Sequence, residues 1–481
     1  MIHMKKSVYA AIIAVFLFSL LFASVGAASS TLYVNGGDEI LAESISSSYA
    51  IGDGAAAAIG TENVYVLTGD GLKMLSDAVQ EKEIQIPDIG ASSVAIRSDV
   101  VKVGLRYYYS ANRNSTVETA NLENATGSGY QFGYFDSDRV FHAQSTTSET
   151  KITMRRIGTS GIGVYITGTN VLLYQVASTS TTSMLAVRPV SYNSDAVTWF
   201  AGYKYYGDFE YAVLGAGNIN VINVVPIEKY VMGVCAIEMN EGWPLEALKA
   251  QAVAARTYAA RYIKNSVYYY NCGFDVTNDT YCQAYTGSTN VGERIVRAVS
   301  ETSNQFLTYN GELCDALYYS SNGGGTEDNV NVNGNDAHPY LKGVIDPYEA
   351  STNYLNAYSS WSYTMTPAQL GAKVNLGSVS YCTVTYSETG NAIAITFTAT
   401  NGSTAKLVRG YCRTTLGLPS IRYTISKDAA GNFVFNGSGW GHNVGMSQFG
   451  AYAMAENYGK TYDEILGFYY TDITLSYGRF D

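Results

Sequence analysis

The feature that most constrains this chain is a change of hydrophobic period at Pro226. From Val100 to about Val225, short runs of β-branched and aromatic residues, such as KITMRRI and GVYITG, are separated by Asn, Ser, Gly and Asp. Such runs predict short strands joined by turns. After Pro226 apolar residues recur at helical spacing, and the alanine-rich stretch from Leu245 to Ile263 has no Gly or Pro for about 19 residues. The sequence therefore predicts an α+β fold, with a β-rich N-terminal region followed by a mixed α+β domain.

Helices are expected at five places beyond this change of period. Trp243-Pro244 opens the alanine-rich helix, since proline suits the first helical turn and Glu246 there complements the helix dipole. Ser447 can cap a later helix through its side chain. Two of the five expected helices start after Pro226 and after Pro244. The other three span about 291–301, 447–456 and 462–469.

The N-terminus predicts export. Lys5 and Lys6 precede an apolar run from about Val8 to Val25, and small residues follow. This order is typical of a secretory signal, while the length of the run is close to one membrane span. We expect an exported, extracytoplasmic protein, with the signal either cleaved near Ala27 or Ala28 or kept as an anchor that contacts the membrane. The predicted domains are a signal or anchor at 1–28, a β-rich segment at 29–99, a β-rich region at 100–219 and the main domain at 220–481.

Charge and cysteine usage exclude several classes of function. The net charge is −11 and no run of lysine or arginine occurs, so the basic face of a nucleic-acid-binding protein is not expected. Cysteine and histidine do not cluster at zinc-ligand spacing, and we expect no metal and no cofactor. Export permits disulfides. The six scattered cysteines are either buried free thiols or include the pairs Cys272–Cys282 and Cys382–Cys412.

Glu238 is the candidate catalytic acid of the helical region. It lies between two predicted helices in Cys235-Ala-Ile-Glu-Met239, among apolar neighbours. Burial favours the protonated form of a carboxyl group, which can then act as a general acid. The alternative is a solvent-exposed glutamate at a helix end. Glu228, Glu241 and Glu246 are interpreted as structural acids of turns and first helical turns.

Three further features could line a site. Arg256 falls in the middle of the alanine-rich helix, where a buried arginine needs a carboxylate of the protein or of a ligand. The loop from Ser320 to Glu327 is rich in glycine, which lets backbone approach a ligand, but it lacks the lysine of a phosphate-binding loop. His442, in GSGWGHNVGMSQ, could be a proton shuttle, a hydrogen-bonding anchor or a core residue.

Four blocks of sequence, in order, resemble the stage II sporulation protein D family, whose domain is shared with the amidase enhancers of bacterial cell walls. The blocks are VPIEKYVMGVCAIEM, WPLEALKAQAVAARTYA, SSNGGGTE with PYLKGV, and GWGHNVGMSQFGAYAMA with the YDEILGFYY ending. The resemblance covers about Asn220 to Asp481 and implies a catalytic-type domain with a glycan cleft.

The resemblance implies an activity and roles for residues. Sporulation members are lytic transglycosylases that cleave the MurNAc–GlcNAc bond of peptidoglycan and leave 1,6-anhydro-muramyl ends. It places the catalytic glutamate on Glu238 and substrate-binding residues on Arg256, Tyr340 and Lys342. Ser320 of the glycine loop and His442 would line the cleft.

This chain departs from the family pattern at two places. Some relatives bind zinc in a segment like FDVCxxxHCQxYxG, whereas FDVTNDTYCQAYTG here keeps only Cys282 and has Thr277 and Tyr281 at two ligand positions. We therefore expect no such zinc. Asn443 replaces the commoner glycine after His442.

Three functions remain open from the sequence. The first is a lytic transglycosylase acting on peptidoglycan glycan strands during sporulation, with other sporulation wall proteins as partners. The second is a non-catalytic wall-binding protein that stimulates a cell-wall amidase. The third is an adhesion module in which the tyrosine-rich strands of residues 30–220 bind wall glycan by themselves.

Overall fold

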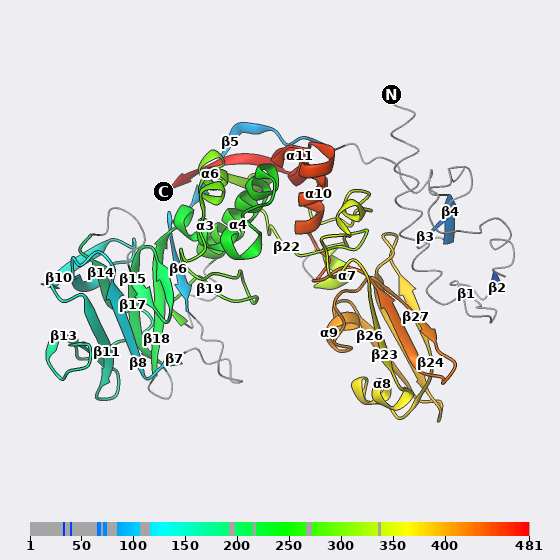
Figure 1. The fold of residues 1–481 in the computed structure, drawn as a ribbon, viewed down its shortest axis with the longest axis horizontal. Helices are drawn as coiled ribbons and strands as arrows, with labels where there is room; N and C mark the ends of the chain where they lie inside the picture. Colours follow the sequence, from blue (N-terminus) through cyan, green and yellow to red (C-terminus); the bar gives the residue numbers. More distant parts are fainter. Residues whose placement is uncertain are drawn as a thin grey trace. The chain divides into compact units, whose positions relative to one another are not determined.

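The computed structural model describes residues 32–33, 39–40, 65–68, 71–74, 84–105, 116–191, 198–214, 218–265, 272–334 and 338–480. Within these residues the predicted α+β class is confirmed, with strands dominating up to Pro226 and helices mixed with strands after it (Figure 1). The chain divides into two compact units. The sheet–helix unit comprises Pro87–Ala316 and Ile473–Asp481, and the glycine-loop unit comprises Met1–Ile86 and Leu317–Asp472.

The largest sheet of the sheet–helix unit has eight strands. All neighbours are antiparallel except the short β19, which runs parallel to β6. Its central strand β18 is buried along almost its whole length, as expected for a strand covered on both faces. The strands, in spatial order, are β10 (Phe141–Thr147), β9 (Tyr130–Phe135), β14 (Leu185–Pro189), β17 (Asp208–Leu214), β18 (Asn218–Pro226), β6 (Val100–Gly104) and β19 (Val276–Thr277), with β7 (Thr116–Val117) also paired to β18.

A second, six-stranded antiparallel sheet has one buried and one exposed face. Its strand β8 alternates strictly between exposed and buried side chains, which is the pattern of a half-buried strand. The strands, in spatial order, are β13 (Leu172–Val176), β12 (Gly161–Ile166), β11 (Lys151–Ile157), β8 (Thr119–Asn124), β15 (Thr198–Phe200) and β16 (Tyr203–Tyr205).

Three helices and a four-stranded sheet complete this unit. The helix α3 follows β18 without a loop, and α4 packs against both α3 and β20. In Figure 1 the blue β5 and the red β30, from opposite ends of the chain, run side by side as a parallel pair. The helices are α3 (Ile227–Glu238), α4 (Leu245–Asn265) and α6 (Glu293–Glu301), and the sheet order is β21 (Glu312–Leu313), β20 (Gln305–Tyr309), β30 (Thr474–Phe480) and β5 (Ile89–Ile96).

An ion pair made by a buried arginine joins these helices to the sheet. Arg256 of α4 has no exposed side-chain surface and binds both carboxylate oxygens of Glu228, at 3.0 and 2.7 Å. Its remaining donors reach the carbonyl oxygens of Val299 in α6 and Gln305 in β20, both at 3.3 Å. One guanidinium group therefore connects four elements. The sequence left open whether Arg256 pairs with a carboxylate of the protein or of a ligand, and in the structure its partner is a carboxylate of the protein.

The glycine-loop unit is built from short elements around irregular loops. The prediction that Ser447 caps a helix is confirmed, since its side chain accepts the N–H of Gly450. Its helices are α7 (Asn329–Val332), η3 (Glu349–Thr352), α8 (Pro367–Lys373), α9 (Tyr411–Thr414), α10 (Gln448–Tyr458) and α11 (Tyr462–Tyr469). Its sheets are β22 (Tyr318–Tyr319) with β29 (Met446–Ser447), β23 (Trp361–Met365) with β28 (Phe433–Gly437) and β27 (Tyr423–Lys427), and β24 (Val379–Tyr386) with β25 (Ala392–Ala399) and β26 (Thr404–Val408). Two hairpins near the N-terminus pair β1 (Leu32–Tyr33) with β2 (Glu39–Ile40) and β3 (Tyr65–Thr68) with β4 (Gly71–Met74).

Several sequence expectations concern the chain as a whole. The predicted signal at 1–28 lies outside the described residues. The predicted domain boundaries stay predictions, although the one at 219/220 falls inside β18. All six cysteines are free in the structure, and neither expected pair is bridged. Among the helices that the structure describes, none is long and apolar enough to cross a membrane.

The contribution of Arg256 to stability can be tested by removing its guanidinium group. We expect Arg256→Met to destabilise the folded chain by about 2–3 kcal/mol, because the substitution removes the donor of two buried carbonyl groups, whereas Glu228, whose side chain is 29 % exposed, keeps the N–H of Asn304. Chemical unfolding of the full chain measures this loss. The matched control is Arg297→Met, which breaks an exposed pair with Glu301 and should cost about 0.5 kcal/mol. Equal losses in the two variants would contradict the assigned role of Arg256.

Candidate active site

Glu238 is the last residue of α3, and its carboxylate is partly buried. Its Oε1 accepts the backbone N–H of Ala284 at 2.9 Å. The apolar stripe of α3 packs into the unit while this C-terminal end stays accessible. The chain turns out of the helix at Met239, which is extended and whose N–H bonds the carbonyl of Cys235.

The position of Glu238 differs from that of the other acids in the opening helices. Glu228, Glu246 and Glu293 lie in the first turns of α3, α4 and α6, where a negative charge complements the helix dipole. Glu241 accepts the N–H of Arg294, at the start of α6, so it also serves a helix N-terminus. Glu238 instead sits at the negative end of its helix dipole, an unfavourable place for a structural carboxylate. Its location therefore favours a role other than helix stabilisation.

The segment that carries Ala284 is held between α3 and α4 by Gln283. The amide oxygen of the buried Gln283 accepts the hydroxyl of Tyr230 in α3, at 3.1 Å. Its amide nitrogen donates to the carbonyl of Ala255 in α4, at 3.4 Å. Gln283 thus ties the segment to both helices, and the next residue presents its N–H to Glu238.

A glycine in α3 allows this segment to approach. Gly233 costs roughly 1 kcal/mol of helix propensity relative to alanine. A Cβ at this position would lie 2.5 Å from the ring of Tyr285 and 2.4 Å from the carbonyl oxygen of Gly287. Tyr285 is fully buried and donates its hydroxyl to Asn223 of β18. The close packing of Tyr285 and Gly287 against Gly233 fixes the segment beside Glu238.

The same segment is the one that resembles a zinc-binding sequence. Thr277, at one of the expected ligand positions, donates its hydroxyl to Asp279 at 2.8 Å, and Tyr281 has 55 % of its surface exposed. Across the residues that the structure describes, no group of three or more His, Cys, Asp or Glu side chains is placed to hold a metal ion. The expectation of no zinc stays a prediction.

In the glycine-loop unit, the loop after β22 wraps around a buried carboxylate. Glu349 has 2 % of its surface exposed and accepts the backbone N–H groups of Asn322 and Gly323, both at 2.9 Å. The hydroxyls of Ser321 and Ser447 also donate to it. Burial, followed by the neighbouring Asp346, raises the pKa of Glu349 to about 6. The group that this loop approaches closely is therefore a carboxylate of the protein itself.

His442 acts in the structure as a hydrogen-bonding anchor. The N–H of Val444 donates to its Nδ1 at 3.1 Å, so Nε2 carries the hydrogen and donates to the carbonyl of Tyr318 at 3.0 Å. Burial, followed by the charge of Arg413, lowers the pKa of His442 to about 4. Of the three roles left open by the sequence, these contacts favour the anchor, which joins the GWGHNVG loop to β22.

The remaining predicted residues of this unit lie near the same loops. Ser320 follows β22, and its carbonyl accepts the N–H of Phe449 in α10. Tyr340 is buried and stacks on His338, with ring centroids 5.3 Å apart. Lys342 is exposed and pairs with Asp328 at 2.9 Å. Of these three predicted residues, Lys342 is therefore the one with an exposed charged group that a ligand could contact.

The predicted site residues divide between the two units. Glu238 and Arg256 lie in the sheet–helix unit, and Ser320, Tyr340, Lys342 and His442 lie in the glycine-loop unit. Arg256 has no exposed side-chain surface, and its donors are bound to acceptors of the protein. It can therefore affect a substrate through the helices and side chains that it holds in position. The substrate-binding roles of these residues stay predictions.

Sequence reasoning missed Gly233, Gln283 and Tyr285, which place the hydrogen-bond donor on Glu238. For Gln283 and Tyr285 a signal was present, because CQAYTG here keeps the Gln, Tyr and Gly of the relatives' pattern although two of the zinc-ligand positions are replaced. Retention of these three residues beside the replaced ligands indicates a packing role for them.

Comparison with known proteins gives one family match. The family model described as "Stage II sporulation protein" matches residues 215–309, which include α3, Glu238, α4 and the segment around Gln283. The matched region is the part of the sheet–helix unit that forms the candidate site.

Individual relatives agree with this match. Stage II sporulation protein D of Bacillus subtilis is 33 % identical over 276 residues, which is 55 % of this chain and 78 % of that protein. An uncharacterised protein of Brachyspira hyodysenteriae is 36 % identical over 57 % of this chain and 73 % of its own length. The amidase enhancer of Bacillus subtilis is 26 % identical over 87 % of this chain and 60 % of its own length.

The anchor role of His442 makes a prediction about pH. The folded chain takes up the proton at about pH 4, whereas the unfolded chain takes it up near pH 6.5. The contribution of His442 to stability is therefore complete above about pH 6.5 and is lost as pH falls towards 4, by about 3 kcal/mol. Urea unfolding of the wild type and of His442→Gln at pH 7 and pH 4.5 isolates this loss, because glutamine keeps one donor and one acceptor but does not titrate. Buried carboxyl groups such as Glu349, whose pKa is raised to about 6, change stability in the opposite direction in both proteins. A His442 NMR resonance that titrates near pH 6.5 would refute the assignment.

Proposed function

Because the chain belongs to the stage II sporulation protein D family, we propose that it is a lytic transglycosylase of the bacterial cell wall. Its substrate in this proposal is the MurNAc–GlcNAc backbone of peptidoglycan, which it cleaves to 1,6-anhydro-muramyl ends during the wall remodelling of sporulation. The catalytic acid is Glu238.

The placement of Glu238 carries the proposal. The carboxyl group ends α3, is partly buried, and accepts one backbone N–H from a segment fixed by Gln283 and Tyr285. Neighbouring acids complement helix N-termini, whereas Glu238 does not. A partly buried carboxyl group that is held in place at the C-terminal end of a helix is suited to proton transfer.

One carboxyl group is sufficient for this reaction. Ordinary glycosidases use two, because a water molecule or an enzyme nucleophile must attack the sugar. In a lytic transglycosylase the acid protonates the leaving glycosidic oxygen, and as a carboxylate it then takes the proton of the 6-hydroxyl of the same muramyl residue. That oxygen attacks the anomeric carbon and closes the anhydro ring. The proton given up in the first step is regained in the second, so Glu238 ends as it began.

The alternative is a wall-binding enhancer of an amidase. The observation that favours it is the alignment with the amidase enhancer over 87 % of this chain, whereas the sporulation proteins match 55 % of it. An enhancer would keep the fold and the cleft but would not need Glu238 to ionise.

Export is part of the proposal. Lys5, Lys6 and the apolar run that follows support translocation of the chain to the wall. Fractionation of cells with N-terminal sequencing of the exported chain tests this point, since a start near residue 28 means cleavage, and retention in the membrane fraction with the full N-terminus means anchoring. Recovery in the cytoplasm would contradict export.

The decisive measurement is mass spectrometry of glycan strands, intact and amidase-stripped, after incubation with the protein. We expect new anhydro-muramyl ends with the wild type and a loss of at least about 100-fold in Glu238→Gln, since a positioned general acid contributes that much. The matched control is Glu241→Gln, three residues away, which keeps an acceptor for the N–H of Arg294 and should remain active.

The other outcomes separate the two functions. Absence of new ends from the wild type on both substrates would refute the transglycosylase. An increase in amidase turnover on addition of the wild type and of Glu238→Gln alike would then identify the enhancer. Equal loss of activity in Glu238→Gln and Glu241→Gln would show that the effect is structural and not catalytic.

A further inference from the structure

The exposed face of the six-stranded sheet carries a row of polar and aromatic side chains in register. Lys204 of β16 pairs with Trp199 of β15, Trp199 pairs with Glu123 of β8, and Glu123 pairs with Lys151 of β11. Paired residues on adjacent strands share a face of the sheet and lie about 5 Å apart. The four side chains therefore form a band across the sheet, perpendicular to its strands.

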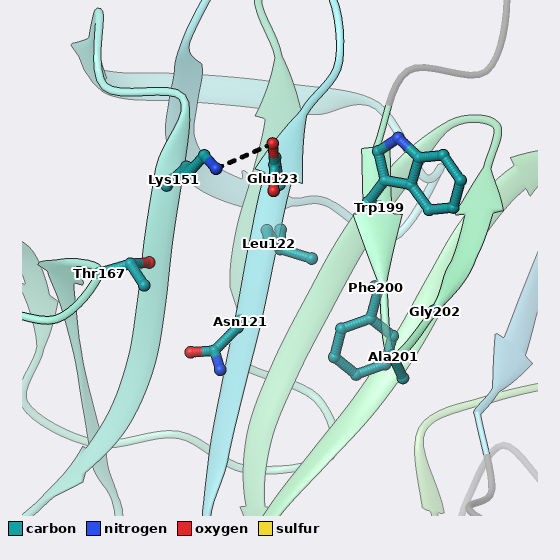
Figure 2. Close-up of a pocket in the computed structure, with 9 residues that line it drawn as sticks. All are labelled: Asn121, Leu122, Glu123, Lys151, Thr167, Trp199, Phe200, Ala201 and Gly202. Atoms are coloured by element: carbon teal, nitrogen blue, oxygen red, sulfur yellow. Dashed lines mark ion pairs between the residues drawn. The ribbon is translucent and has the colours of Figure 1, made fainter.

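A shallow pocket of about 200 Å³ lies along this band, and residues of β8, β11 and β15 line it. Figure 2 shows Trp199 on one strand and the Glu123–Lys151 ion pair on the neighbouring strands, with Asn121 and Thr167 below it. The hairpin residues Ala201 and Gly202 also line it, and their small size keeps the pocket open at that end.

Trp199 is the apolar surface of this pocket. It has 38 % of its surface exposed, although the residues on either side of it in β15 are buried. The ammonium group of Lys204 lies 5.3 Å from the centre of its ring and holds the indole from the next strand. Lys204 does not line the pocket, so the ring is supported from outside the pocket and remains available within it.

The polar groups around Trp199 suit an amino sugar that carries a carboxylate. Asn121 accepts the hydroxyl of Thr153 through its Oδ1, so its amide nitrogen is what it offers to an acetamido oxygen. The pair between Lys151 and Glu123 is half exposed on both sides, and such a pair holds its partners weakly. Lys151 can therefore exchange Glu123 for a ligand carboxylate, while Glu123 accepts from sugar hydroxyls.

From this geometry we propose that the exposed face of the six-stranded sheet is a second glycan-binding site, at which Trp199 stacks on a sugar ring and Lys151 pairs with the carboxylate of a muramyl residue. This inference rests on the proposed function for the identity of the polymer, a strand of alternating N-acetylated sugars with a carboxylate on every second one. A flat face with an aromatic platform fits a polymer that lies across the strands. The site would hold the strand without taking part in its cleavage.

The test measures co-sedimentation of the full chain with insoluble, amidase-stripped wall glycan, in a Glu238→Gln background so that the polymer stays intact. We expect Trp199→Ala to weaken binding about tenfold. The matched control is Tyr203→Ala. Tyr203 is 41 % exposed in the same hairpin, but it pairs with the buried Phe200 and so lies on the opposite face. Tyr203→Ala should bind as the parent does.

A second comparison tests the charge. Lys151→Met should weaken binding to wall glycan but not to chitin, which has the same acetamido groups and no carboxylate, whereas Trp199→Ala should weaken binding to both. Parental binding by Trp199→Ala, or equal losses in Trp199→Ala and Tyr203→Ala with both variants folded by circular dichroism, would overturn the site. The assay needs no cleavage, so failure of the site is distinguishable from failure of the wild type to form anhydro-muramyl ends.

Discussion

The pair between Arg256 and Glu228 is the interaction on which the helical part of the structure depends. Glu228 opens α3, Arg256 lies in the middle of α4, and the remaining guanidinium donors reach carbonyl groups of α6 and β20. Removing a charged side chain from water is unfavourable unless its hydrogen bonds are replaced, and here the protein replaces them. Because each acceptor belongs to a different element, the arrangement of three helices and a sheet is fixed around one buried cation.

The helix α3 links this pair to Glu238 at its other end. Glu238 lies ten positions after Glu228, which is about 15 Å along a helix. The first carboxylate is held by the buried arginine and complements the helix dipole, while the second accepts the N–H of Ala284 from the segment around Gln283. Between them Gly233 lets Tyr285 and Gly287 pack against the helix. Two glutamates of one helix therefore have different surroundings, and this difference supports the proposal that only the second takes part in chemistry.

The glycine-loop unit shows a different use of small residues. Glycines in SSNGGGTE suggest a loop that a ligand can approach, and the structure places a carboxylate of the protein there instead. Gly323 has a positive φ of 64°, and a Cβ on it would lie 2.4 Å from the hydroxyl of Ser438. The glycines are thus needed to fold two loops around Glu349. His442, neutral and bonded through both ring nitrogens, anchors one of them to β22.

The sequence by itself determined the fold class and most of the local structure. The change of period at Pro226 predicted strands before it and helices after it, and the helix Tyr462–Tyr469 has the predicted limits. These features follow from short-range spacing and from caps such as Ser447, which act within a few residues of the chain.

The tertiary structure alone decided the partners of the charged groups. Arg256 and Glu228 are 28 residues apart and Glu238 and Ala284 are 46 apart, and no spacing rule relates such positions. For the same reason the row from Lys204 to Lys151 could not be found in the sequence, because strand register depends on which strands become neighbours and not on the order of the residues.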